Sequence, residues 1–196
     1  MRSLREKLGI AFLLLWAPLA IGIIGLLMVN HTVAMPSPTR LDRVEAALRT
    51  VAPDGHLVVH VIFAGCSCTD SLVDHLIARR ADPSRREVVW FVGTMLPRHQ
   101  PLGAAGYELR TPTAEELSEE LDLRAAPLLF ALRDGHLAYA GGYFALPAAV
   151  RPLDQQLLAA LDDGEAADPL PVFGCAMDPT LRRTVDPLGL QAASRR

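Results

Sequence analysis

The pattern of apolar and polar residues predicts strands and helices between residues 41 and 162. Two short, β-branched apolar runs, HLVVHVIF (56–63) and EVVWFVGT (87–94), have the length of strands that are covered on both faces. Apolar residues at helical spacing predict four helices, over residues 41–51, 68–80, 113–121 and 152–161. His60 lies inside the first apolar run, where its alternation with Ile62 predicts a side chain that faces the core.

A hairpin is expected after the third of these helices. Apolar runs over 127–132 and 136–143 flank Asp134-Gly135, a dipeptide typical of a tight turn between antiparallel strands. Strands that alternate with helices give a parallel core, and the hairpin adds antiparallel edge strands. The sequence therefore predicts an α/β domain with a central mixed sheet flanked by helices over residues 41–162. Residues 163–196 are expected to form a tail outside the core.

A long uncharged segment precedes this domain. No charged residue occurs from Gly9 to Val29, and a helix of this length is about 30 Å long, which matches the hydrocarbon core of a bilayer. The segment predicts a transmembrane anchor over 9–29, followed by a linker over 30–40. The alternative is a cleaved signal peptide, with Thr32-Val33-Ala34 as the cleavage site.

Charge sets the expected orientation. Basic residues precede the apolar segment and none follows it directly, so residues 1–8 are expected in the cytoplasm. The prediction is a single-pass protein of the bacterial inner membrane, bound to the membrane by this helix, with its domain on the periplasmic side. The chain has a formal net charge of −3 and no evident basic patch, which argues against nucleic acid as a partner.

The candidate chemistry lies in three cysteines: Cys66, Cys68 and Cys175. The first two are separated by Ser67 and stand between a predicted strand and a predicted helix. The amino end of a helix carries partial positive charge, which stabilises a thiolate and lowers the pKa of a cysteine. Asp70 lies in the same turn and would oppose this effect. A thiolate attacks disulfides and binds soft metals.

Three segments, HLVVHVIFAGCSC, EVVWFVGT and AAPLLFALRDGHLAYAGGY, resemble the thioredoxin-like superfamily, and in particular its membrane-anchored, exported members. The resemblance covers about residues 41–161. It implies a thioredoxin-like fold and a cis peptide bond before Pro127, which would shape a groove where the backbone of a partner docks. The glycine that the family has near the end of the hairpin is matched by Gly141-Gly142.

Two features depart from the family pattern. The cysteine pair has one intervening residue instead of two, and Gly65 stands where the family has a tryptophan. A disulfide across one residue closes a smaller and more strained ring, and strained disulfides are easier to reduce. If Cys66 and Cys68 pair, an oxidant or isomerase is expected. If strain prevents the bond, Cys175 is the other candidate partner.

The leading hypothesis is a thiol–disulfide oxidoreductase that acts on exported protein thiols and needs no cofactor. By resemblance, Cys66 is the attacking thiolate, and Cys68 or Cys175 resolves the mixed disulfide. One alternative is a copper(I)-binding module that uses Cys66 and Cys68 with Cys175 and Met177, since these soft sulfur ligands suit copper(I). Another is a redox-inactive binding domain of the same fold.

Overall fold

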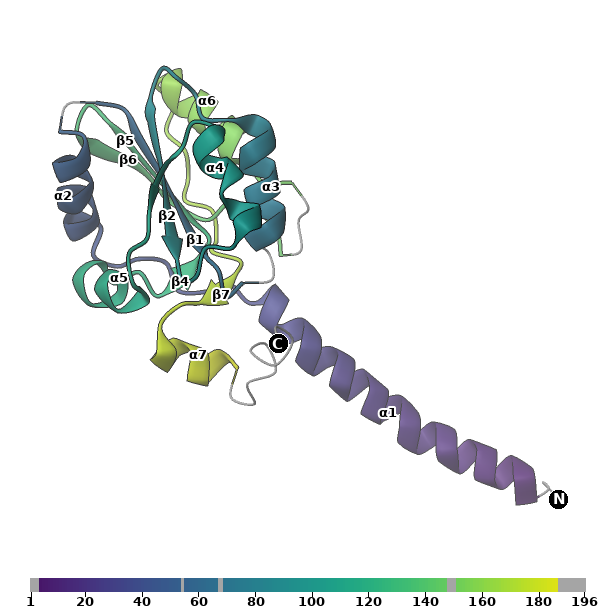
Figure 1. The fold of residues 1–196 in the computed structure, drawn as a ribbon. Coiled ribbons are helices and arrows are strands. Elements are labelled where there is room, and N and C mark those ends of the chain that lie inside the picture. The colour runs from purple at the N-terminus through teal and green to yellow at the C-terminus, as the bar shows by residue number, and fades with distance from the viewer. Residues whose placement is uncertain (1–3, 54, 67–68, 148–150, 187–196) are drawn as a thin grey trace.

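The computed structural model describes residues 4–53, 55–66, 69–147 and 151–186. Its centre is a five-stranded mixed sheet with helices on both faces, and a long amino-terminal helix extends away from it (Figure 1). The predicted α/β class, with a central mixed sheet flanked by helices, is confirmed.

The strands are β1 (Leu57–Phe63), β2 (Arg86–Val92), β3 (Glu108–Arg110), β4 (Ala125–Ala126), β5 (Leu128–Arg133), β6 (His136–Gly141) and β7 (Cys175–Ala176). The helices are α1 (Leu4–Thr32), α2 (Leu41–Val51), α3 (Thr69–Arg79), the 3-10 helix η1 (Pro97–His99), α4 (Pro101–Ala104), α5 (Ala114–Leu121), α6 (Asp154–Asp162) and α7 (Pro179–Val185).

The large sheet has the strand order β3-β2-β1-β5-β6, and β4 pairs with β7 in a separate two-stranded sheet. β1 is parallel to β2 and antiparallel to β5, while β2 is parallel to β3 and β5 is antiparallel to β6. The predicted strands and the Asp134-Gly135 hairpin are therefore present. β1 occupies the centre because its apolar run is buried on both faces.

Alternate residues of β1 face two separate cores. Leu57, Val59 and Val61 pack with α2 and α5 on one face of the sheet. Val58 and Ile62 pack with α3 and α6 on the other face. Figure 1 shows α2 and α5 on one side of the sheet and α3, α4 and α6 on the other. His60 is on the α3 side and fully buried, as its alternation predicts.

The segment between β2 and the hairpin holds more structure than its sequence suggests. η1 and α4 occupy the region, and β3 follows them. β3 has only three residues, none of them buried, so it lacks the apolar alternation that identifies a strand. The amino end of α5 does follow a sequence signal. Thr113 Oγ1 accepts from Glu116 N–H at 3.1 Å, and Thr113 N–H donates to Glu116 Oε2 at 2.8 Å.

The predicted transmembrane helix is wrong. In the part of the chain that the structure describes, no helix is long and apolar enough to cross a membrane. The periplasmic location inferred from this segment stays a prediction.

The carboxyl-terminal segment contributes to the core, although the sequence predicts a tail outside it. Val172 and Met177 are both fully buried and pack in the cluster on the α2 and α5 face. Met35 N–H donates to Val172 O at 2.8 Å, which ties the segment before α2 to the carboxyl-terminal segment. Residues 187–196 lie outside the described residues.

A network of buried charges lies on the α3 side of the sheet. Glu87 accepts from His60 Nε2 at 3.0 Å and from both terminal nitrogens of Arg79. Arg79 Nε lies 3.2 Å from Asp154 Oδ2. His60 Nδ1 lies 2.5 Å from the hydroxyl of the buried Tyr143. These contacts join α3, α6 and both central parallel strands.

The network shifts the pKa of two members in directions that favour a charged Glu87 and a neutral His60. Burial raises the pKa of Glu87, but hydrogen bonds from His60 and Arg79 outweigh burial and lower that pKa to about 2. Burial lowers the pKa of His60, and this effect exceeds the opposing attraction of Glu87. A neutral His60 can donate through Nε2 to Glu87 and accept the Tyr143 hydroxyl proton at Nδ1.

We expect Glu87→Gln to lower the free energy of unfolding by about 3–5 kcal/mol, because it removes one of the two carboxylates that pair with the buried Arg79 charge. Urea unfolding followed by circular dichroism measures the change. Glu108→Gln is the matched control. Glu108 is partly exposed and pairs with Arg86 and Arg110, so its loss should cost less than about 1 kcal/mol. Equal costs would contradict the assigned role of Glu87.

Stability should fall as the solution is acidified. His60 has a lowered pKa in the folded state, so its contribution is complete above the unfolded pKa of about 6.5 and is lost as pH falls through that value. Glu87 adds a second loss between about pH 4.5 and pH 2. Urea unfolding at pH 7.5, 6.5, 5.5 and 4.5 measures the slope. A free energy of unfolding that stays constant or rises over this range would contradict the neutral His60.

Candidate functional site

Cys66 lies in a tight turn directly after β1. Its N–H donates to Phe63 O at 2.9 Å, and the hydroxyl of Thr69 donates to the same oxygen at 2.5 Å. Thr69 begins α3, and its N–H donates to Cys66 O at 3.2 Å. The turn therefore fixes Cys66 between the strand and the helix, as predicted, with the residue 6% exposed. Ser67 and Cys68 lie outside the described residues.

Pro127 lies close to the same end of β1. Leu128 pairs with Val61 in the antiparallel register of β1 and β5. The register ends there, and the two residues before Pro127 form β4, which contacts β1. The Ala126–Pro127 peptide bond is cis. Phe63 also packs against the core cluster that contains Ala126.

The carboxyl-terminal segment brings Cys175 to this position. β7 pairs antiparallel with β4, so that Cys175 is opposite Ala126 and Ala176 is opposite Ala125. Met177 N–H continues the pairing with a 2.8 Å hydrogen bond to Arg124 O. Figure 1 shows β7 and β4 side by side, at the end of the sheet where β1 finishes. Cys66, Pro127 and Cys175 therefore share one end of the molecule.

Gly174 makes this close approach of the two strands possible. A Cβ atom on Gly174 would lie 1.9 Å from Ala126 O and 2.5 Å from Pro127 Cδ. Both distances are far below van der Waals contact, so only glycine fits at this position while β7 is docked. The glycine before Cys175 is visible in the sequence. What it contacts cannot be read there, since Ala126 is 48 positions away.

A cation that the sequence analysis did not identify lies beside the cysteine turn. The Arg182 guanidinium carbon is 5.2 Å from the centre of the Phe63 ring. Arg182 Nη2 donates to Met177 O at 3.1 Å, and Arg182 Nε donates to Ala176 O at 3.4 Å. α7 holds Arg182 there, and Asp178 caps this helix by accepting from Leu181 N–H at 2.6 Å. Arg182 thus links the end of β1 to β7.

Met177, the predicted thioether ligand, is a residue of the core. Its side chain is fully buried in the core cluster on the α2 and α5 face. Among the described residues, no group of three or more His, Cys, Asp or Glu could hold a metal ion. The four-sulfur copper set stays a prediction, because its member Cys68 lies outside the described residues.

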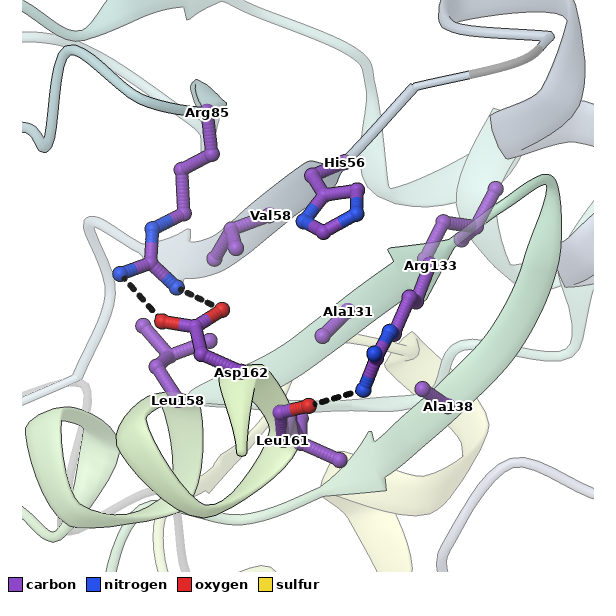
Figure 2. Close-up of a pocket in the computed structure, with 10 residues that line it drawn as sticks. His56, Val58, Arg85, Ala131, Arg133, Ala138, Leu158, Leu161 and Asp162 are labelled. Atoms are coloured by element: carbon purple, nitrogen blue, oxygen red, sulfur yellow. Dashed lines mark hydrogen bonds and ion pairs between the residues drawn. The ribbon is translucent and has the colours of Figure 1, made fainter. Parts of the chain in front are cut away.

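Two hollows lie at the opposite end of the sheet. One has a volume of about 20 Å³, room for about one water molecule. Figure 2 shows His56, which precedes β1, and Val58 of β1 among its lining residues. Arg85 and Asp162 pair across it, with Nη2 and Oδ2 3.1 Å apart. A more open hollow of about 370 Å³ lies beside the end of α3 and α6. Neither is lined by a cysteine, so neither belongs to the site.

Comparison with known proteins gives no function. No model of a known protein family matches the chain, and no curated protein sequence matches it. A crystal structure of a hypothetical protein from Sinorhizobium meliloti 1021 is similar at 17% identity and a TM-score of 0.49, covering 66% of this chain and 82% of that chain. An uncharacterized conserved protein from Geobacillus kaustophilus is similar at 17% identity and a TM-score of 0.44, with coverages of 64% and 79%. Similarity at this level carries no argument about activity.

Arg182→Ala should loosen β7 from β4, because it removes the hydrogen bonds to Ala176 O and Met177 O and the contact with Phe63. We expect the Met177 amide, which donates to Arg124 O, to exchange with deuterium about 10-fold faster. Hydrogen exchange followed by NMR or mass spectrometry measures this rate. Arg183→Ala is the control, because Arg183 is exposed like Arg182 but makes no hydrogen bond to β7 among the described residues. Equal exchange in both variants would mean that Arg182 does not hold β7.

Proposed function

We propose that this protein is a thiol–disulfide oxidoreductase in which Cys66 attacks and Cys175 resolves. The observation that carries the proposal is the pairing of Cys175 with Ala126 in β4, a strand that contacts β1, the strand that Cys66 follows. Thiol exchange needs two thiols at one place, and this pairing supports such an arrangement for Cys66 and Cys175.

The same features support assigning the chain to the thioredoxin-like class. They are the mixed five-stranded sheet, the cysteine turn between β1 and α3, and the proline that opens the β5–β6 hairpin. The proposed thiol exchange at the Cys66 turn does not depend on that assignment, because it needs only the cysteine thiols.

The exchange proceeds in two balanced steps. The Cys66 thiolate attacks one sulfur of a disulfide R–S–S–R, forming a Cys66–S–S–R bond and releasing RS⁻. The Cys175 thiolate then attacks the Cys66 sulfur, which forms an intramolecular disulfide and releases a second RS⁻. Two protein thiols are oxidised, one disulfide is reduced to two thiols, and the thiol protons of the protein end on the released RSH molecules.

The charges around the turn favour a thiolate. α3 begins at Thr69, three residues after Cys66, and the Arg182 guanidinium lies over the Phe63 ring. Asp70, the nearby carboxylate expected to oppose ionisation, pairs with Arg98 Nε at 2.9 Å and lies 3.3 Å from His99 Nε2. These partners offset the negative charge at the start of α3.

Cysteine variants test the proposal. We expect Cys66→Ser to slow the reaction of the reduced full-length protein with glutathione disulfide by at least about 100-fold, because the attacking thiolate is gone. Cys175→Ser should still react, but it should stop at a mixed disulfide whose added glutathione is visible by intact-protein mass spectrometry. Cys68→Ser is the matched control, and it should complete both steps.

Each part of the proposal can fail separately. A Cys66→Ser variant with the rate of the unmodified protein would overturn the role of Cys66. If Cys175→Ser completes the reaction and Cys68→Ser stops at the mixed disulfide, then Cys68 and not Cys175 is the resolving thiol.

A further inference from the structure

The edge of β4 has the position of a docking strand for a partner. Extended peptides bind proteins by adding a strand to an exposed sheet edge, where unpaired backbone groups supply the hydrogen bonds. β4 is a strand of two residues that contacts β1, and Cys66 follows the end of β1. An extended segment with a cysteine opposite Ala126 would present that cysteine to the site.

In this protein the chain itself fills that edge. β7 supplies the strand, and Cys175 is the cysteine opposite Ala126. The backbone of Gly174 lies against Ala126 O so closely that no larger residue fits. The docking edge and the strand that occupies it are therefore complementary in both register and shape.

The occupying strand is fixed at both ends. Val172 before it and Met177 after it are fully buried in the core. Further upstream, Gly142 N–H donates to Leu170 O at 2.9 Å, and a Cβ atom on Gly142 would lie 1.9 Å from Pro171 O. Beyond Met177, Arg182 and the cap of α7 hold the segment from the other side.

Displacement by a partner strand is therefore unfavourable. A strand in the same chain competes with an effective concentration on the order of millimolar or higher, whereas a partner protein at micromolar concentration has no such advantage. A small disulfide can reach the Cys66 thiol without pairing with β4, so it does not compete with β7.

We infer that the substrate class of the site is the low-molecular-weight disulfide, and that extended protein segments are excluded by β7. This inference rests on the proposed thiol exchange and names its substrate. The small disulfide R–S–S–R reacts at Cys66 with release of RS⁻. Cys175 already lies opposite Ala126, in the position that the cysteine of a partner strand would occupy. It attacks the Cys66 sulfur of the mixed disulfide and displaces the second RS⁻.

Two probes with the same leaving group test the inference on the reduced full-length protein. One is glutathione disulfide, and the other is an extended ten-residue peptide whose central cysteine is disulfide-bonded to glutathione. We expect glutathione disulfide to oxidise the protein at least about 10-fold faster than the peptide does, in single-turnover measurements by mass spectrometry.

Gly174→Val should reduce the ratio of the two oxidation rates at least about 5-fold, because the valine side chain would collide with Ala126 O and displace β7 from β4. Gly103→Val is the control. It adds the same side chain at a position where the nearest atom to the new Cβ would be Leu109 Cδ1 at 3.8 Å, an ordinary van der Waals contact. Gly103→Val should therefore leave the ratio of the two oxidation rates unchanged. Arg182→Ala loosens β7 from the opposite side and should narrow the ratio in the same direction, which keeps the test informative if Gly174→Val does not fold.

The outcomes separate the two proposals. Equal rates with both probes, or a faster reaction with the peptide, would overturn the substrate class and leave the thiol exchange standing. No reaction with either probe would overturn the thiol exchange itself. A ratio that is the same in the unmodified protein, in Gly174→Val and in Arg182→Ala would overturn the role of β7.

Discussion

The approach of Gly174 to the Ala126–Pro127 peptide determines where the carboxyl-terminal segment can lie. A Cβ at this position would collide with Ala126 O, so the absence of a side chain permits β7 to pair with β4. That pairing carries Cys175 to the end of β1 and sends Met177 into the core. Cys66 and Cys175, remote in the sequence, become parts of one candidate site through this backbone contact.

β1 joins this site to the buried charges on the other side of the sheet. His60 lies in the middle of the strand, where its two nitrogens contact Glu87 and Tyr143. Three residues later the same strand ends at Phe63, which supplies the carbonyl that holds the Cys66 turn. Because Arg79 of α3 also belongs to the buried network, the strand and the helix that flank the cysteine turn are tied together beneath it.

The sequence predicts those parts of the fold that depend on local patterns. Apolar runs identify the central strands, helical spacing identifies α2, α3, α5 and α6, and Thr113 with Glu116 marks the start of α5. β3 leaves no such pattern because its three residues are not buried. The uncharged run at the amino end of the chain is a different case. It predicts a transmembrane span, and no described helix meets the requirements for one.

The sequence predicts which residues belong to the candidate site, but it does not predict how the fold brings them together. Cys66 lies after a buried strand, where the sequence places it, and Pro127 precedes the hairpin strand. The sequence left open whether Cys175 reaches the turn, because β4 and β7 are two residues long and pair across about fifty positions. Arg182 gave no signal at all. An arginine in a segment rich in proline and glycine reads as a solvated charge, and its contact with Phe63 depends on the tertiary fold.

Disulfide mapping of the full-length protein tests the central claim most directly. The reduced protein is equilibrated with excess glutathione disulfide, the remaining thiols are alkylated, and the linked peptides are identified by mass spectrometry. The account predicts an intramolecular disulfide that joins Cys175 to Cys66. Complete alkylation of Cys175 after the other cysteines have been oxidised would contradict it.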